Sequence, residues 1–450
     1  MGRIRHDVMK PVYRPRGGAK VPHKKFTAEQ QTVVMPPPEQ VFIPMQQHIG
    51  APCKPMVRPG DKVSLGQVIG DTDKFVSAPI HASVSGTVSA ITEIQMPGGN
   101  MVETVVIDSD GQMTPSPEVS PYTVETVEDL LQAAKVSGLV GLGGAGFPTH
   151  VKLKPNPDRP IDTIIINAAE CEPFITADYR ECMENTDMIM NGVYLLLDIL
   201  KPERIIIAVE DNKPAAIEKL LAIADSDRDT EHRVHVMKLR SRYPQGAEKV
   251  LVLSATGRKI PMGKLPSDVG CAVMNVTSVA ALWRFISTGM PLVTKRVTVD
   301  GPDMKQHAKN VLVPIGTPVE KVIEFAGGPD GEISKALMGG PMMGLALADG
   351  SIPVMKQTNA IIVFNKEKDI AGFKEGPCIR CGRCASACPM SLMPTLIERY
   401  AKIKDVESLT RIGVGVCMEC GSCAFNCPAH RPLVQYMRLA KEIQRNGGRK

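Results

Sequence analysis

The sequence predicts a multidomain chain of the α/β plus β class, in which a helix-covered sheet stands between two β regions and a small helical domain follows. Three observations lead to this fold class. Short β-type runs separated by turns fill residues 41–112 and return after residue 291. Between them, apolar runs of strand length alternate with helical patterns, which is typical of a largely parallel sheet. Eight of the twelve cysteines then fall in two copies of one pattern.

The composition is that of an ordinary globular chain. Its 450 residues are enough for about three domains, and no run of eighteen apolar residues occurs, so we expect no transmembrane segment. The net charge of +5 is mild. Aromatic residues are few and basic residues gather near the termini, which disfavours a nucleic-acid-binding protein. We expect residues 1–40 to form a basic arm that is either a solvated tail or docks on lipid headgroups or a protein.

The two cysteine runs share the spacing C-x2-C-x2-C-x3-C-P. In bacterial two-cluster ferredoxins with this spacing, the first three cysteines hold one [4Fe–4S] cluster and the fourth holds the other. This predicts cluster one at Cys378, Cys381, Cys384 and Cys427. It predicts cluster two at Cys388, Cys417, Cys420 and Cys423. Zinc ribbons use two C-x2-C pairs with a longer gap, and the cysteines lie too close together for a secreted disulfide framework, so both alternatives fit less well.

Periodicity locates the main elements of each region. In the α/β region we expect strands over 161–167, 204–210 and 234–239, and helices over 127–136, 183–200, 214–224 and 277–287. In the first β region we expect strands over 67–69, 76–78, 86–90 and 103–107. The second β region should contain strands over 296–299 and 360–364 and a helix over 319–325, and the cysteine domain should contain helices over 392–403 and 434–445.

A glycine-rich loop interrupts the α/β region at residues 138–149. Gly141, Gly143 and Gly146 satisfy G-x-G-x-x-G. A dinucleotide fingerprint follows a strand and opens a helix, whereas here a helix precedes the loop and the strand comes after it. The ordinary Rossmann interpretation therefore fails. The glycines still allow the backbone to approach a flat ligand or a phosphate closely, and a purely structural turn is the alternative.

Residues 57–63, with the segments up to Val88, resemble a barrel-sandwich domain of the biotinyl and lipoyl type. In that family a hairpin lysine carries the prosthetic group, and Lys74 lies roughly at this place. The residues around Lys74 are not a close match to a modification site, so we expect an unmodified, structural module.

Residues 141–149, followed by Lys152, resemble the flavin loop of the NADH- and FMN-binding subunit of respiratory complex I. Residues 167–173, 243–248 and 275–277 resemble the next motifs of that family, and residues 313–318 resemble its SLBB β-grasp module. The resemblance implies that FMN and NAD(H) are held by Gly141, Gly143, Gly144, Gly146, Phe147, Lys152, Asn167, Glu170, Glu172, Gly246, Glu248 and Asn275. The sequence departs from that family, which has polar or charged residues, at Leu142, Ala169, Ala247 and Met274.

The order of these modules resembles the RnfC/RsxC family, the C subunits of the Rnf ion-translocating ferredoxin:NAD oxidoreductase complexes, over about residues 20–440. The resemblance implies a basic arm over 1–40, a barrel-sandwich domain over 41–112, a Rossmann-like FMN- and NADH-binding domain over 113–290, an SLBB β-grasp module over 291–355 and a helical ferredoxin-like domain over 356–450.

The same resemblance implies a peripheral electron-transfer subunit at the cytoplasmic face of a bacterial or archaeal membrane. Electrons would pass between NAD(H), FMN and the two clusters, and the partners would be the other subunits of the complex and, through them, ferredoxin. No catalytic acid, base or nucleophile is expected, because the cofactors carry the chemistry. Two alternatives stay open: a soluble flavin and iron–sulfur reductase such as a cobalamin reductase, and an electron-transfer scaffold without flavin.

Overall fold

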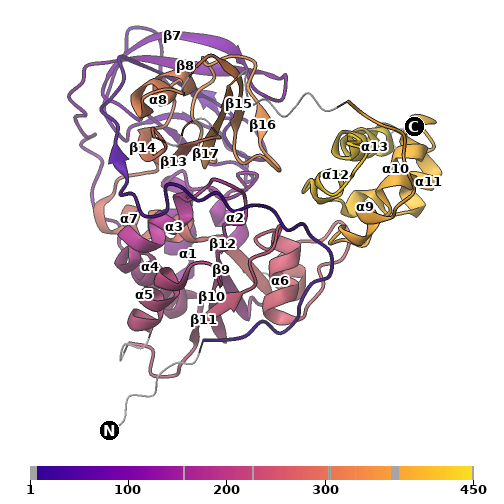
Figure 1. The fold of residues 1–450 in the computed structure, drawn as a ribbon. Coiled ribbons are helices and arrows are strands. Elements are labelled where there is room, and N and C mark those ends of the chain that lie inside the picture. The colour runs from indigo at the N-terminus through magenta and orange to yellow at the C-terminus, as the bar shows by residue number, and fades with distance from the viewer. Residues whose placement is uncertain are drawn as a thin grey trace.

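The structure is a computed structural model that describes residues 8–155, 158–224, 228–302, 304, 306–329, 331–365 and 374–447. Figure 1 shows an α/β body, a second body built from the two β regions, and a helical cysteine domain at one side. The predicted fold class is therefore confirmed. Among the described residues, no helix is long and apolar enough to cross a lipid bilayer.

The α/β body is built on a four-stranded parallel sheet with the order β11-β10-β9-β12. These strands are β9 (Thr163–Ala168), β10 (Arg204–Glu210), β11 (Val234–Leu239) and β12 (Cys271–Asn275). The helices are α1 (Val127–Val136), α2 (Thr149–Leu153), α3 (Ala177–Glu184), α4 (Thr186–Leu200), α5 (Pro214–Ala224), α6 (Glu248–Thr256) and α7 (Val276–Thr288).

Alternate residues of the central strands pack against helices on opposite faces of this sheet. Ile164 and Ile166 join a core with α1, α4, α5 and α7, while Ile165 joins a separate core with α6. All three isoleucines are fully buried. Apolar side chains on both faces are what a parallel sheet covered by helices requires, and this explains why the predicted strands read as continuous apolar runs.

Two of the predicted elements are wrong. The helix expected over 183–200 begins only at Thr186, as α4, and a separate helix that was not expected, α3, precedes it. Asn185 leaves the helical conformation (φ −125°, ψ 33°) between the two. The strand expected over 76–78 does not form. Val76 instead accepts an isolated hydrogen bond from the N–H of Ala51 (3.0 Å), and the next strand, β6, is Ile80–His81.

The first β region folds as two small sheets that share one core. One sheet has the order β2-β8-β7-β4, with β2 (Gln40–Pro44), β8 (Met101–Ser109), β7 (Gly86–Gln95) and β4 (Lys62–Val63). The other has the order β3-β5-β6, with β3 (Lys54–Pro55), β5 (Val68–Asp71) and β6. Ile43 and Ile107 from the first sheet meet Ile69 and Ile80 from the second in this core. Lys74 lies between β5 and β6 with its side chain 66% exposed.

The second β region is a six-stranded sheet with the order β1-β14-β13-β17-β15-β16. It comprises β1 (Val33–Val34), β14 (Lys309–Pro314), β13 (Thr294–Asp300), β17 (Ala360–Asn365), β15 (Ile333–Met338) and β16 (Leu345–Ala346). Helix α8 (Val319–Ala326) packs on it through Val319, Val322 and Ile323.

The cysteine domain contains α9 (Arg383–Ser386), α10 (Pro394–Lys402), α11 (Val406–Arg411), α12 (Ser422–Phe425) and α13 (Leu433–Gly447). It has its own core, in which Ile397 of α10 and Leu409 of α11 meet Met437 and Ala440 of α13. Its two halves repeat one plan, since a cysteine loop, a short helix and a longer helix follow one another in each.

From residue 8 onward, the N-terminal arm runs along the α/β body to the second β region (Figure 1). In the arm, the N–H of Met9 donates to the carbonyl of Val236 in β11 (2.9 Å). Further along, the backbones of Ala19 and Tyr243 exchange two hydrogen bonds (2.7 and 3.2 Å). Its last residues form β1, which adds to the edge of the β-grasp sheet beside β14. Residues 8–34 are therefore not a solvated tail, because they pair with the α/β sheet and with the β-grasp sheet.

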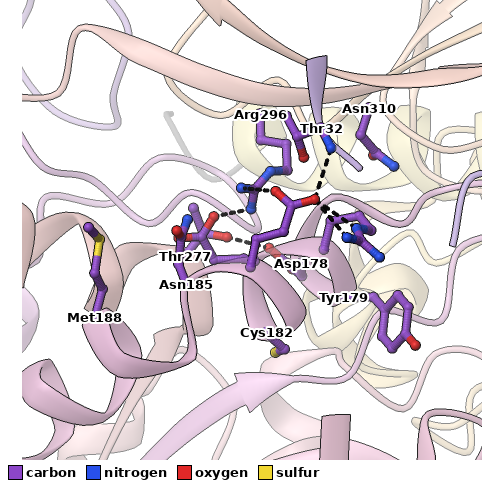
Figure 2. Close-up of polar contacts among 12 residues, drawn as sticks. Thr32, Asp178, Tyr179, Cys182, Asn185, Met188, Thr277, Arg296 and Asn310 are labelled. Carbon is purple, nitrogen blue, oxygen red and sulfur yellow. Dashed lines mark hydrogen bonds and ion pairs between the residues drawn. The ribbon is translucent and has the colours of Figure 1, made fainter. Parts of the chain in front are cut away.

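Helix α3 carries buried charges that are paired with other segments (Figure 2). Arg296 of β13 donates to Glu181 and to Glu184, the latter at 2.9 Å. Glu184 also accepts from Arg180 of its own helix (2.8 Å) and from the N–H of Thr32 in the arm (2.8 Å). A charge removed from water is stable only when it is paired and hydrogen-bonded, so this cluster joins α3, the β-grasp sheet and the arm.

Arg296→Met should lower the free energy of unfolding by about 3–5 kcal/mol, because it leaves the buried carboxylate of Glu181 without its cation, while Glu184 keeps Arg180. The single tryptophan, Trp283 of α7, lies in the α/β body and gives a fluorescence signal for urea unfolding of the FMN-free protein.

Lys321→Met is the matched control. Lys321 pairs with Glu324 on the exposed surface of α8, and exposed pairs contribute little. We expect its unfolding curve to superpose on that of the wild type. An Arg296→Met curve that also superposes would show that the buried cluster does not stabilise the α/β body.

Candidate functional site

Most of the predicted flavin and nucleotide residues gather at the carboxyl edge of the parallel sheet. Asn167 lies near the end of β9, and Asn275 ends β12 beside it. The glycine loop lies against Asn275, since a side chain on Gly143 would come within 2.6 Å of the Asn275 amide nitrogen. Ligands of open α/β sheets bind at this edge.

The glycine loop is a tight turn closed by backbone hydrogen bonds. The N–H of Gly141 donates to the carbonyl of Phe147 (2.9 Å), and the N–H of Thr149 donates to the carbonyl of Leu139 (3.1 Å). Gly144 faces open space, because a Cβ at this position would lie more than 4 Å from every described atom beyond its chain neighbours. The loop thus exposes bare backbone at Gly144 while Gly143 is held against the domain.

Asn275 packs against Gly143 and holds the glycine loop in place. Its side-chain oxygen accepts from the N–H groups of Thr277 (2.9 Å) and Ser278 (3.4 Å) and so caps α7. Its amide nitrogen donates to Asp178 of α3 (2.7 Å), which also accepts from the Thr277 hydroxyl (2.8 Å). Asp178 is a site residue that sequence reasoning missed, because nothing in the local pattern distinguishes it from a surface acid.

Glu170 is buried, and both of its carboxylate oxygens face the start of α3. One accepts from the N–H of Asp178 (2.8 Å) and the other from the N–H of Tyr179 (3.4 Å). Burial raises the pKa of Glu170, while the free N–H groups of a helix N-terminus favour a carboxylate. Glu170 therefore positions α3, and through Asp178 it supports Asn275.

Lys25 of the arm fixes the loop that carries Glu170 and Glu172. Its ammonium group donates to the carbonyls of Glu170 (2.9 Å), Glu172 (2.7 Å) and Ile175. Lys213 reaches the carbonyl of Glu170 as well (3.3 Å). Part of the basic arm is thus a structural component of the site, and this role has no signal in the sequence.

Glu172 turns toward the β-grasp module rather than toward the glycine loop. Its carboxylate accepts from the N–H of Met342 (3.0 Å), and it lies so close to Gly340 that a side chain there would come within 2.3 Å. Burial raises the pKa of Glu172 to about 7. The structure therefore does not bring Glu172 together with the glycines.

Lys152 is the cation of the site. Its amine lies 3.8 Å from a carboxylate oxygen of half-exposed Glu248 and close to Gly141. Burial lowers the pKa of Lys152, which indicates a poorly solvated ammonium group that gains from an anionic ligand. The side chain is well placed to pair with a phosphate or an anionic ring.

Asn167 and Gly246 tie two loops together beside this cation. The amide of Asn167 donates to the carbonyl of Gly246 (2.9 Å), and its oxygen accepts from the N–H of Ala169 (3.1 Å). A side chain on Gly246 would come within 2.4 Å of the Ala169 carbonyl, so glycine is required there by close backbone approach.

The apolar replacements in the flavin motifs fill the core. Leu142 and Met274 are both buried in the main core of the α/β body, and the N–H of Leu142 donates to the hydroxyl of Ser278 (3.2 Å). These two side chains therefore contribute to packing rather than to ligand recognition. The polar part of the site is formed by Lys152 and by the loop backbone.

Four cysteines line one apolar-walled cavity in the C-terminal domain: Cys388, Cys417, Cys420 and Cys423. The wall also contains Leu392, Met418 and Met437. Cys388 belongs to the first run and the other three to the second, so the two runs cross. In the described part of the chain, no three His, Cys, Asp or Glu side chains are grouped as ligands of a single metal ion. Four thiols around one cavity are the donor set of a cubane cluster, whose thiolates bind separate irons.

The other four cysteines are more open. Cys384 is buried, and burial together with the neighbouring Cys427 thiol raises its pKa. Cys378 and Cys381 are exposed. That these four cysteines hold the second cluster stays a prediction.

Family models match four successive regions of the chain. They are described as the RnfC barrel sandwich hybrid domain (residues 13–112), the Nuo51 FMN-binding domain (134–284), the SLBB domain (296–346) and the 4Fe-4S dicluster domain (371–428). A structure of an NAD+-reducing [NiFe]-hydrogenase in the air-oxidised state matches with a TM-score of 0.49 at 20% identity, over 71% of this chain and 63% of that chain.

Two relatives match nearly the whole chain. The C subunit of the proton-translocating ferredoxin:NAD(+) oxidoreductase complex of Clostridium ljungdahlii is 43% identical over 94% of this chain and 92% of its own length. The C subunit of the Na(+)-translocating complex of Acetobacterium woodii is 42% identical over 86% and 87%.

The fold and the two sites define a multidomain protein that joins an FMN-binding α/β domain of the complex I type to a two-cluster iron–sulfur domain. The chain belongs to the RnfC family, which comprises the C subunits of the ion-translocating ferredoxin:NAD(+) oxidoreductase complexes.

Gly143→Ala should weaken FMN binding at least tenfold (~1.4 kcal/mol) and lower the thermal midpoint, because its methyl group displaces the Asn275 amide. Gly144→Ala should weaken FMN binding without changing the midpoint, since its methyl group meets only the ligand. The measurements are FMN fluorescence titration and differential scanning fluorimetry of FMN-free protein. Wild-type FMN affinity in both variants would place the flavin away from this loop.

Proposed function

We propose that this protein is the peripheral electron-transfer subunit of a membrane ferredoxin:NAD(+) oxidoreductase complex, in which partner subunits transport ions. The observation that carries the proposal is the presence, on one chain, of the glycine loop with the half-buried Lys152 and of the crossed cysteine cavity. The two relatives that span nearly the whole chain bear such names. FMN, when bound, exchanges hydride with the nicotinamide and single electrons with the clusters.

The residues of the α/β site have different roles in this proposal. Gly141 and Gly144 present backbone to the flavin, and Lys152 pairs with its negative charge. Phe147, in the same loop, offers a ring for stacking. Asn275 positions the loop.

Glu170 and Gly246 support the flavin site indirectly. Glu170 holds α3 in place, and Gly246 packs against the loop after β9. Asn167 does the same for the loop that carries Gly246. Glu248, predicted as a nucleotide residue, is the ion-pair partner of Lys152 in the structure. Glu172 and Gly146 stay predictions as nucleotide residues.

The cysteine domain holds two [4Fe–4S] clusters in the crossed pattern. Cys388, Cys417, Cys420 and Cys423 form one set around the apolar cavity. Cys378, Cys381, Cys384 and Cys427 form the other. The proposal keeps the division of the chain at residues 1–40, 41–112, 113–290, 291–355 and 356–450.

The protein acts at the cytoplasmic face of the membrane, bound to the other subunits of the complex and supplied with NAD(H). Ferredoxin reaches it through those subunits. The proposal is supported by the family to which the chain belongs, and it ranks above a soluble reductase because the matched relatives are subunits of translocating complexes.

Anaerobically purified protein should contain about eight iron atoms per chain and should take up one FMN. NADH should then bleach the flavin absorption and the broad iron–sulfur absorption together, and Lys152→Met should weaken FMN uptake while leaving the iron content unchanged. Intact clusters without bound or reconstitutable flavin would refute the proposed oxidoreductase function. Recovery of the chain free of membrane subunits at low salt would favour the soluble reductase.

The crossed ligation predicts which cysteines share a cluster. Cys388→Ser should alter the same EPR signal as Cys420→Ser, although the two residues come from different runs, because both line one cavity. Cys381→Ser is the matched control within the first run, and it should alter the other signal. If Cys388→Ser and Cys381→Ser changed the same signal instead, each run would hold its own cluster.

A further inference from the structure

The two cysteine loops are copies of one backbone conformation. Arg380 and Glu419, each two residues after the first cysteine of its run, both have left-handed backbones (φ 57° and 56°). Gly382 and Gly421 follow with φ 74° and 79°. We call residues 377–383 the cluster-one loop and residues 416–422 the cluster-two loop. Because the backbones match, differences between the loops come from their side chains and from what covers them.

The cluster-two loop is covered by the rest of the chain. Met418 and buried Cys420 pack with Tyr243 of the α/β body and with Met342 of the β-grasp module. A side chain on Gly421 would come within 2.9 Å of the Met342 carbonyl. This end of the cysteine domain is therefore an internal interface.

The charge of the cluster-two loop is also neutralised internally. Glu419 pairs with Arg438 (3.1 Å) and Lys441 (2.6 Å) of α13. All residues from 416 to 422 lie in the described part of the chain, and Glu419 is the single charged residue among them. This loop therefore presents no unpaired charge to another protein.

The cluster-one loop has the opposite environment. Every residue from 377 to 383 is exposed, including the two cysteines, and Ile379 is 64% exposed. Neither Arg380 nor Arg383 makes a side-chain hydrogen bond or an ion pair within the part of the chain that the structure describes. The nearby acid Glu375 is already paired with Arg431 (3.1 Å).

We propose that the cluster-one loop is the docking surface for the protein that exchanges electrons with this chain, and that this partner presents an apolar contact flanked by carboxylates. The inference rests on the proposed function and deepens it. An exposed isoleucine alone is ordinary, but here it stands between two cluster ligands and beside two exposed guanidinium groups. Arginine binds carboxylates through two parallel hydrogen bonds and is enriched at the centres of protein interfaces.

The surface fits a protein better than a membrane. Two arginines around one apolar side chain offer few cations for anionic lipid, which is recognised by larger basic clusters. A docked partner would cover the exposed cysteines in the way that Tyr243 and Met342 cover the equivalent loop, so each cluster would face one protein interface.

Photo-crosslinking in the whole complex tests the location. Ile379→p-benzoylphenylalanine should yield crosslinks to Asp- or Glu-rich segments of one other subunit, identified by mass spectrometry. Ile403→p-benzoylphenylalanine is the matched control, because Ile403 is equally exposed (66%) and lies at the end of α10. Crosslinks from position 403 alone, to lipid alone or to this same chain alone would overturn the proposal.

Binding tests the chemistry. The oxidised subunit, with its iron content verified, is titrated onto membranes of a strain that lacks this subunit. Because binding is measured without electron transfer, a change in cluster potential does not affect the result. Arg380→Glu/Arg383→Glu should weaken binding at least tenfold and flatten its salt dependence, because the charge complementarity is lost. Arg399→Glu/Lys404→Glu, with the same charge change on the same domain, should bind within twofold of the wild type. Equal affinity and equal salt dependence for the two double variants would refute a carboxylate-bearing partner, whereas failure to bind FMN would refute only the proposed function.

Discussion

The pairing of the buried charges on α3 is the constraint on which the rest of the molecule depends. Glu170 caps the helix, Asp178 holds Asn275 beneath the glycine loop, and Glu184 binds Arg296 of the β-grasp sheet and Thr32 of the arm. An unpaired buried charge costs several kcal/mol, so none of these segments moves without disturbing the others. The support of the flavin loop is thus shared between three parts of the chain.

Motif resemblance and contact geometry assign different kinds of role to the same residues. The acids of the motif after β9 are drawn inward, Glu170 to a helix terminus and Glu172 to the backbone of Met342. The polar contacts to the ligand are then left to Lys152 and to the glycine backbone. Such a site recognises its ligand by shape and by one charge, and it relies on neighbouring segments for precision.

The sequence was sufficient where a local pattern carries the structure. The strands β10 and β11 are predicted to the residue because they are apolar runs bounded by turns. Helix α1 is predicted to the residue from its periodicity, and in the structure Thr126 and Asp129 form a capping box at its start. Helix α3 was missed because its buried face is charged rather than apolar. Lys25 was unpredictable for another reason: its acceptors lie about 145–150 residues away in the chain, and nothing local marks it.

The course of the arm has a consequence for biosynthesis. The arm leaves the ribosome well before the β-grasp sheet, yet Val33 pairs with Val311, in a strand made much later. At roughly 5–20 residues per second, the arm waits on the order of tens of seconds for that sheet edge. During this interval Lys25 can already reach its acceptors, because residues 170–175 are made long before β14. Pairing of β1 with β14 is then the late step, and it joins the arm to a sheet edge that is made after the α/β domain.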